Sequence, residues 1–261
     1  MSKIAVSKDS QPYNILRLSI IDSTNVFAKT RFEELRDRTI IVADNQTAGK
    51  GRVGRSWLSR DGNLFMTLVL KPNTHFSRES GHSCLTHYIG VCLCLLLERM
   101  GLKPGLKWPN DIQVEKKKIA GILAESIPLS KRTMGIILGI GVNLNLLDSD
   151  LESIDQPAIS LTQLLPPAKR PSRDIFMKEL LDIFFERYDL FLKKGFPVIA
   201  ETYNSFLLYR DCPIRLETEQ YTLHGTVRGV NANGALLLVN EENKLIEYFA
   251  GDIWPDTSAP N

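Results

Sequence analysis

The residues best suited to chemistry lie in the segment Gln46–Trp57, QTAGKGRVGRSW. Its three glycines let backbone amides approach a ligand closely, and they make the empty loop costly to order. Lys50, Arg52 and Arg55 add three positive charges, so we expect a bound anion to neutralise and order the loop. The spacing does not match a Walker A loop, because no Gly-Lys pair is followed by Ser or Thr. Alone, the segment fits a solvated basic loop equally well.

A second candidate is the turn Lys107-Trp-Pro-Asn-Asp111. Proline sets the turn, and Asn110 and Asp111 then present polar side chains at its tip. One carboxylate beside an amide suits a Mg²⁺ ion that keeps most of its waters and binds phosphate. Taken alone, the pattern is better explained as an ordinary Pro-Asn-Asp turn.

Two further polar residues border apolar strands. Lys118 begins the apolar run that leads to Glu125, so we expect its side chain to enter a site, whereas Lys116 and Lys117 are expected to be solvated. An ammonium placed there can neutralise a substrate carboxylate and an α-phosphate together. Asn143, at the end of the glycine-bearing strand GIGVN, is expected to hydrogen-bond a base or a ribose.

Taken together, these four segments predict one reaction. A carboxylate that attacks the α-phosphate of ATP brings two anions together, so positive charge and Mg²⁺ must offset their repulsion. Such a reaction needs no Ser-His-Asp or Cys-His set. We therefore expect the histidines to have no catalytic role; they are His75, His82, His87 and His224. We expect the cysteines to be buried free thiols; they are Cys84, Cys92, Cys94 and Cys212.

The surrounding pattern predicts a mixed sheet with segregated helices, an α+β fold. Strand and helix do not alternate regularly, which argues against a doubly wound nucleotide fold. The predicted strands are Thr39–Ala43, Asn63–Leu70, Met134–Val142, and a hairpin of Asp111–Val114 with Ile119–Ala124 around the turn Glu115–Lys118. The predicted helices are Ser23–Asp37, Ser83–Met100, Ser172–Lys194 and Pro197–Tyr209, with Leu146–Pro171 as a connection.

After Asp211 the pattern changes to short strands separated by turns, with Asn233-Gly234 as a hairpin signal. That texture predicts a small SH3-like barrel. We therefore expect two domains, 13–210 and 211–256.

The sequence resembles the biotin protein ligase family from about Tyr13 to Ile253. The motifs that carry the resemblance occur in the same order as in the family: Ser23-Thr24-Asn25, Gln46–Trp57, KWPND at Lys107–Asp111, KIAGILAE at Lys118–Glu125 and GIGVNLN at Gly139–Asn145. The resemblance implies a ligase that activates biotin as biotinyl-5′-AMP and transfers it to one lysine of the biotin carboxyl carrier protein domain of acetyl-CoA carboxylase. It also implies a catalytic domain related to class II tRNA synthetases.

The same resemblance implies a role for each matched residue. Arg52 and Lys118 would be catalytic and would contact both biotin and ATP. The other biotin-binding positions would be Ser23, Thr24, Asn25, Gln46, Gly49, Lys50, Gly51 and Gly121. Arg55, Trp57, Asn110 and Asn143 would bind ATP, and Asp111 would hold Mg²⁺. Lys50 stands where the family often has arginine, but a backbone contact is expected there.

Composition limits the partners. The formal net charge is only +2, so attraction for nucleic acid would have to be local. The longest apolar run, Tyr88–Leu97, is shorter than the roughly 20 residues that cross a bilayer. The N-terminus has no apolar signal core, so we expect a cytoplasmic protein. Larger family members carry a DNA-binding winged helix, for which the segment before Ser23 is too short, so we expect no DNA binding. The sequence leaves a homodimer open.

Two other functions fit part of the sequence pattern. A lipoate- or octanoate-protein ligase would share the scaffold, but a lipoyl tail offers no ureido ring for Gln46 and Ser23–Asn25 to bind. A nucleic-acid-binding module could use the basic loop and the small barrel, and it would bind with a steep salt dependence.

Overall fold

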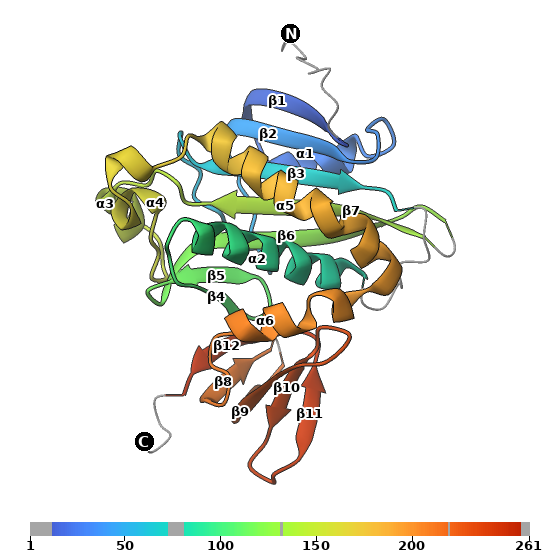
Figure 1. The fold of residues 1–261 in the computed structure, drawn as a ribbon, viewed down its shortest axis with the longest axis vertical. Helices are drawn as coiled ribbons and strands as arrows, with labels where there is room; N and C mark the ends of the chain where they lie inside the picture. The colour runs from blue at the N-terminus through green and yellow to red at the C-terminus, as the bar shows by residue number, and fades with distance from the viewer. Residues whose placement is uncertain (1–11, 73–80, 131–132, 219, 257–261) are drawn as a thin grey trace.

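A seven-stranded mixed sheet forms the larger part of the molecule in the computed structural model, which describes residues 12–72, 81–130, 133–218 and 220–256 (Figure 1). The strand order is β1-β2-β3-β7-β6-β5-β4, and only β1 and β2 pair in parallel. The strands are β1 Asn14–Ile21, β2 Thr39–Gln46, β3 Leu64–Leu70, β4 Pro104–Lys107, β5 Asp111–Val114, β6 Lys117–Pro128 and β7 Met134–Val142. The predicted α+β fold is confirmed.

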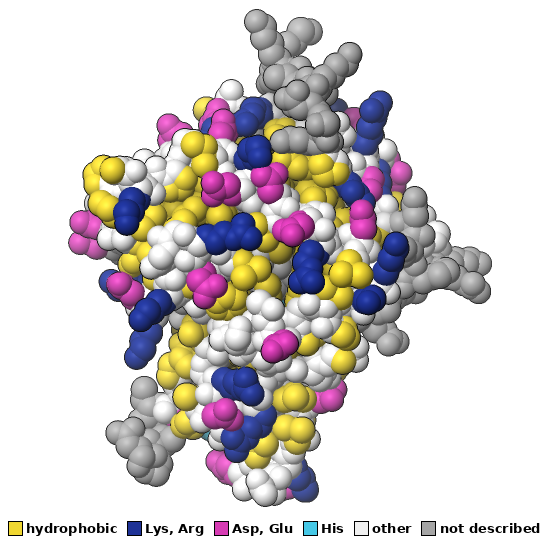
Figure 2. Space-filling model, viewed as in Figure 1, with side chains coloured by type: hydrophobic (Ala, Val, Ile, Leu, Met, Phe, Trp, Pro, Cys, Tyr) yellow, Lys and Arg dark blue, Asp and Glu magenta, His cyan; other side chains and the backbone are white. Residues whose placement is uncertain are grey.

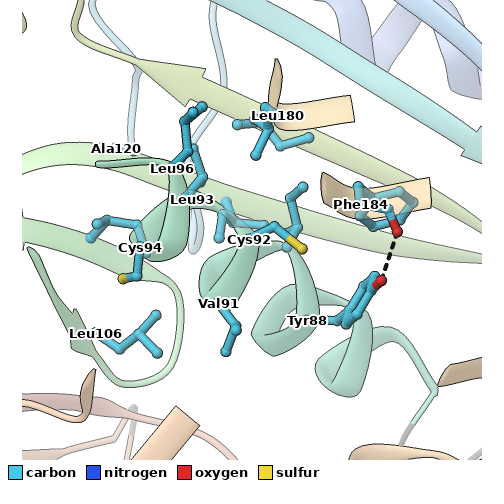
Figure 3. Close-up of a cluster of buried hydrophobic side chains, with 14 of the residues drawn as sticks. Tyr88, Val91, Cys92, Leu93, Cys94, Leu96, Leu106, Ala120, Leu180 and Phe184 are labelled. Carbon is cyan, nitrogen blue, oxygen red and sulfur yellow. Dashed lines mark hydrogen bonds between the residues drawn. The ribbon is translucent and has the colours of Figure 1, made fainter. Parts of the chain in front are cut away.

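Two long helices, α2 (Gly81–Arg99) and α5 (Arg173–Lys194), cover one face of this sheet (Figure 1). Their packing buries large apolar side chains, and Tyr88 Oη donates a hydrogen bond to the Phe184 carbonyl at 2.6 Å (Figure 3). Cys92 and Cys94 lie in this core, where burial raises the pKa of both thiols. Cys84 is also buried as expected, but Cys212 is exposed.

The opposite face of the sheet carries α1 (Thr24–Thr30). Here Ala28 and Phe32 pack against Ile41, Val69 and Ile137. The predicted helix Ser23–Asp37 is therefore wrong in extent, although it begins after Ser23 as expected. The helix ends at Thr30, and Phe32, which is 3 % exposed, packs into this small core from the turn that follows.

The hairpin β5–β6 turns at Glu115 and Lys116, which both have positive φ (52° and 60°). A two-residue turn of this kind joins strands directly, so Lys117 and Lys118 belong to β6 and not to the predicted turn. Ile112 pairs with Ala120, but Gln113 pairs with Lys118. Ile119 is thus an extra residue, a β-bulge of the sort that redirects neighbouring side chains.

The connection Leu146–Pro171 contains three short helices: α3 Asp148–Glu152, α4 Leu161–Leu164 and η1 Pro167–Lys169. The helix predicted over Pro197–Tyr209 is also shorter than expected, because the chain forms η2 (Phe196–Val198) and α6 (Ala200–Phe206).

A five-stranded antiparallel sheet, ordered β11-β10-β9-β8-β12, follows α6 and forms the expected SH3-like unit. Its strands are β8 Pro213–Glu217, β9 Thr222–Val230, β10 Leu236–Val239, β11 Leu245–Tyr248 and β12 Asp252–Pro255. Ile214 and Leu236 of this sheet share one core with Leu106 and Trp108 of the large sheet. The boundary predicted between residues 210 and 211 stays a prediction.

The face of the molecule seen in Figure 2 carries lysine, arginine, aspartate and glutamate side chains interspersed over it. This distribution agrees with the small net charge of +2. Among the helices that the structure describes, none is long and apolar enough to cross a membrane.

Candidate active site

The predicted site residues gather around one cavity of about 950 Å³, measured with its open mouth. The large sheet, α1, the loop Gln46–Trp57 and the segment after α3 all contribute to its wall. The predicted residues that line it are Ser23, Thr24, Asn25, Gln46, Lys50, Gly51, Arg52, Arg55, Trp57, Asn110, Asp111, Lys118, Gly121 and Asn143. Only Gly49 is missing from this set; a Cβ atom there would lie 2.6 Å from the Trp57 carbonyl oxygen, so the loop's own packing requires this glycine.

One end of the cavity is a buried hydrogen-bonded cluster around the start of α1. Gln46 Oε1 accepts from the Thr24 amide at 2.8 Å and from the Thr24 hydroxyl at 3.2 Å. Asn25 Nδ2 donates to Glu125 at 3.2 Å, while Thr67 Oγ1 lies 2.7 Å from Asn25 Oδ1. Thr67 and Glu125 were not predicted from the sequence. The cluster can present fixed donors and acceptors to a polar ring.

The floor of the cavity is one face of β7. Ile136, Leu138 and Ile140 point to the α2–α5 core, so the alternating positions, which include Gly139 and Gly141, face the cavity. A Cβ atom at Gly139 would collide with the Asn25 carboxamide, and one at Gly141 would lie 2.5 Å from the Trp57 ring. The protein's own side chains therefore approach this strand closely at both glycines.

The loop Gln46–Trp57 folds back on itself as a small hairpin. The Gly51 amide donates to the Arg55 carbonyl at 2.7 Å, and the Trp57 amide donates to the Gly49 carbonyl at 2.9 Å. At its tip Val53 and Gly54 both have positive φ, 51° and 72°. A β-branched residue is strained in this region. Val53 is exposed at the tip, so the backbone hydrogen bonds of the hairpin hold it in this conformation.

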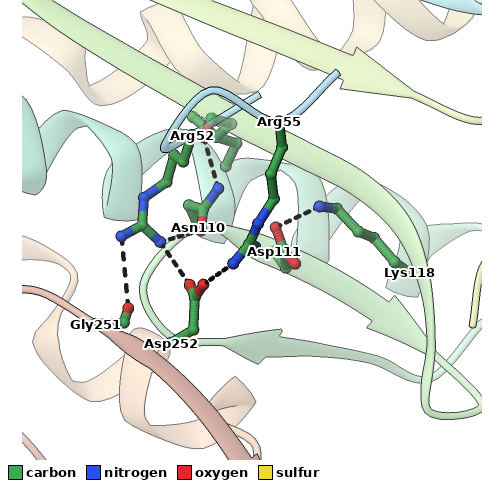
Figure 4. A network of polar contacts seen from close by, with 8 residues as sticks. Arg52, Arg55, Asn110, Asp111, Lys118, Gly251 and Asp252 are labelled. Atoms are coloured by element: carbon green, nitrogen blue, oxygen red, sulfur yellow. Dashed lines mark hydrogen bonds and ion pairs between the residues drawn. The ribbon is translucent and has the colours of Figure 1, made fainter. Parts of the chain in front are cut away.

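Both arginines of this hairpin bind one carboxylate from the C-terminal sheet (Figure 4). Arg52 Nη1 lies 3.0 Å from Asp252 Oδ1 and also donates to Asn110 Oδ1 at 2.9 Å. Arg55 Nη2 pairs with the other oxygen, Asp252 Oδ2. Sequence reasoning missed Asp252, because nothing local in the strand that contains it marks a site.

Lys118 points into the cavity and pairs with Asp111 at 2.9 Å. Both side chains are only 13 % exposed, and the Lys118 ammonium lies 5.3 Å from the centroid of the Trp57 ring. The bulge at Ile119 allows this orientation, since it leaves Lys118 beside Gly121 on the cavity face. The Lys118 side chain thus lies in the cavity wall, and its role there stays a prediction.

The turn Lys107–Asp111 is buried more deeply than a surface turn. Trp108 is 1 % exposed, and its Nε1 donates to the Gly234 carbonyl at 3.3 Å. The Lys107 ammonium lies 3.3 Å above the Trp254 ring. Burial lowers the pKa of Lys107, and the carboxylates of Asp111 and Asp252 act in the opposite direction.

Asn143 is buried, and its side chain is hydrogen-bonded to the segment after α3, which forms one side of the cavity. Its Nδ2 donates to the carbonyls of Lys118 at 3.3 Å and Ile159 at 3.2 Å. Ile154, Gln156 and Ala158 of that segment also line the cavity and were not predicted.

Within the described ranges, no three His, Cys, Asp or Glu side chains lie close enough together to bind a metal ion. Asp111 stays a predicted Mg²⁺ ligand: its carboxylate lines the cavity, and a Mg²⁺ bound mainly by water and phosphate needs only one or two carboxylates.

The histidines take no part in the site as far as the structure describes them. His87 is buried against Phe196 and Tyr203, and His224 pairs with Asp256 on the C-terminal sheet. His75 and the side chain of His82 lie outside the described residues.

Comparisons with known proteins agree with this arrangement. The model of the biotin/lipoate A/B protein ligase family matches residues 18–143. A biotin–[acetyl-CoA-carboxylase] ligase of Paracoccus denitrificans is 31 % identical over 230 residues, which are 85 % of this chain and 92 % of that protein. The chain belongs to the biotin protein ligase family.

Other members of the biotin protein ligase family are similar over most of the chain. The bifunctional ligase/repressor BirA of Bacillus subtilis is 32 % identical over 82 % of this chain, and the match spans 65 % of BirA. A biotin protein ligase of Aquifex aeolicus, solved in complex with biotin and ATP, has 29 % identity and a TM-score of 0.77. That match covers 92 % of this chain and 97 % of the Aquifex chain. The resemblance found in the sequence is thereby confirmed at the level of the family.

Proposed function

We propose that the protein activates biotin with ATP and transfers the biotinyl group to a lysine of a biotin carboxyl carrier protein, that of acetyl-CoA carboxylase. One observation carries the proposal: a single cavity joins a buried polar cluster at Thr24, Asn25 and Gln46 to a cationic cluster at Arg52, Arg55 and Lys118. The first cluster suits the ureido ring of biotin, and the second suits a carboxylate and a polyphosphate. Membership of the family and the similarity to the Aquifex protein support this reading.

In the proposed first step, a biotin carboxylate oxygen attacks the α-phosphorus of ATP. The bond to the β-phosphate breaks, and pyrophosphate leaves. Lys118 and Arg52 would offset the charge that develops where the two anions meet. Asn110 and Asp111 would bind MgATP, in which Mg²⁺ neutralises phosphate charge. Since Asp111 already pairs with Lys118 at 2.9 Å, the metal and the lysine would share this carboxylate.

In the proposed second step, the neutral amine of the carrier lysine attacks the acyl carbon of biotinyl-AMP. The amide forms, the amine loses a proton, and AMP leaves. Until then the hairpin Gln46–Trp57 would cover the adenylate and limit its escape to water.

The remaining site assignments are proposals of the same kind. Biotin would be bound by Ser23, Thr24, Asn25, Gln46, Gly49, Lys50, Gly51, Arg52, Lys118 and Gly121, and ATP by Arg52, Arg55, Trp57, Asn110, Lys118 and Asn143. The sequence leaves open whether the protein forms a homodimer. A cytoplasmic location and the lack of DNA binding stay predictions from the sequence.

Incubation with biotin, MgATP and a biotin carboxyl carrier domain tests the function. We expect one added biotinyl mass on one lysine of the carrier. Lipoate in place of biotin serves as the control, because it lacks the ureido ring. Modification with lipoate but not with biotin would reverse the proposed specificity.

A further inference from the structure

Strand β12 brings a carboxylate of the C-terminal sheet to the two arginines of the hairpin. Asp252 receives one arginine on each oxygen, Arg52 on Oδ1 at 3.0 Å and Arg55 on Oδ2 (Figure 4). The preceding residue takes part as well, because the Gly251 carbonyl accepts from Arg52 Nη2 at 3.5 Å. One short strand thus fixes both guanidinium groups.

Asp252 lies behind the arginines as seen from the cavity. Arg52 and Arg55 line the cavity, whereas Asp252 does not. Its side chain is 19 % exposed, compared with 56 % for Arg55. A phosphate that enters the cavity would therefore meet the guanidinium groups without having to displace the carboxylate.

Two guanidinium groups this close repel each other unless an anion lies between them. Asp252 supplies that anion and keeps the two groups convergent. The polar network still holds more positive than negative charge, with Arg52, Arg55 and Lys118 against Asp111 and Asp252. A polyphosphate can offset the excess.

We propose that Asp252 is a positioning residue for ATP: it holds Arg52 and Arg55 together so that both can bind the polyphosphate. The proposal rests on the proposed function and extends it, since it makes the C-terminal sheet part of the nucleotide site. Asp252 itself touches no substrate in this scheme.

Substitution of Asp252 tests the proposal. In biotin-dependent ATP–pyrophosphate exchange, Asp252→Asn is expected to raise the KM for ATP by about tenfold. The KM for biotin should rise clearly less, because Arg52 is only one of the groups proposed to bind biotin, whereas both arginines are proposed to bind ATP. Asp252→Glu keeps the charge and should recover most of the ATP affinity. Glu217→Gln is the matched control, because Glu217 is the direct cross-strand partner of Asp252 but pairs with Arg215 on its own strand.

A double variant tests the proposed cause, the relief of repulsion between Arg52 and Arg55. If Asp252 acts by relieving repulsion, Asp252→Asn should cost less in an Arg55→Ala background than in wild type, so the two effects should not add. Additive effects would overturn the proposed cause. An unchanged KM for ATP in Asp252→Asn, or an equal rise in the KM for ATP and the KM for biotin, would also overturn the proposal. So would an equal rise in the KM for ATP in Glu217→Gln. Loss of the near-UV circular dichroism signal in Asp252→Asn would overturn it as well, because the residue would then support the fold as a whole.

Calorimetric binding of a non-hydrolysable ATP analogue keeps this proposal separate from the proposed function. A wild-type protein that binds the analogue but never biotinylates a carrier would refute the function. The comparison of Asp252→Asn with wild type for analogue binding would still decide the role of Asp252.

Discussion

Lys118 is the side chain on which the proposed first step depends most. Its side chain is 13 % exposed, its ammonium lies 2.9 Å from Asp111, and it directly precedes the β-bulge at Ile119. We expect Lys118→Ala to lower kcat/KM for ATP–pyrophosphate exchange by about 10²–10³-fold, because charge stabilisation in the transition state is lost. Lys117→Ala, at the exposed neighbour, is the control and should leave exchange unchanged. Normal exchange in Lys118→Ala would contradict the assigned role.

The buried His87 is expected to make the free energy of unfolding depend on pH. Neither of its ring nitrogens has a hydrogen-bond partner, and burial lowers its pKa from 6.5 to about 3. The unfolded chain therefore binds a proton below pH 6.5 that the folded chain does not bind until about pH 3. The resulting loss of stability begins as the pH falls through the unfolded pKa and grows until the folded pKa is reached.

We expect this histidine to reduce the free energy of unfolding by about 1.4 kcal/mol between pH 7.5 and pH 5.5. Urea unfolding of wild type and His87→Leu at both pH values measures it. The substitution should remove that part of the pH dependence. An identical dependence in both proteins would show that folding does not lower the pKa of His87.

At the scale of the element, β7 shows how one strand serves both the core and the site. Its glycines leave space on the cavity face that the Asn25 carboxamide and the Trp57 ring occupy. A methyl group at either position would push one of these side chains away from its place. The two positions should therefore report on different substrates.

We expect Gly139→Ala to displace Asn25 and raise the KM for biotin by at least about tenfold, since a shift of about 1 Å can cost that much or more. Gly141→Ala should displace Trp57 and raise the KM for ATP instead. Gly135→Ala is the control on the same strand, because its added methyl group would meet Phe32 outside the cavity. It should lower stability by about 1–3 kcal/mol without changing either KM. The reverse pattern of KM changes would refute the assignment of the two ends of the cavity.

At the scale of the whole molecule, the two sheets behave as one packing unit. Ile214, Leu216 and Ile253 of the small sheet belong to the same core as Leu106 and Trp108 of the large one. In addition, Trp108 donates a hydrogen bond to the Gly234 carbonyl, and Lys107 packs on Trp254.

We therefore expect a single thermal unfolding transition for the whole chain. A chain that ends at residue 210 should lose cooperative unfolding, because its apolar surface at Leu106 and Trp108 would be exposed to water. Scanning calorimetry and near-UV circular dichroism measure both effects. Two separate transitions in the full chain would show that the C-terminal sheet folds independently.

The sequence by itself determined the fold class, the buried strands Asn63–Leu70 and Met134–Val142, and the two long helices. These features depend on local pattern: apolar runs and periodicity define the elements, and glycine, proline and charge at fixed spacing define the loops. Local pattern also singled out the loop Gln46–Trp57, Asn110, Asp111, Lys118 and Asn143, whereas Ser23, Thr24, Asn25 and Gly121 came from the resemblance to the family. Lys118 could be singled out from its neighbours because it directly precedes the apolar run that begins at Ile119.

Only the tertiary structure decided which distant groups meet. Asp252 lies 200 residues from Arg52 along the chain, and Thr67 and Glu125 reach Asn25 across the sheet, so no local pattern marks them. The bulge at Ile119 follows from strand register. Such features depend on packing and pairing between distant segments, which override local preference.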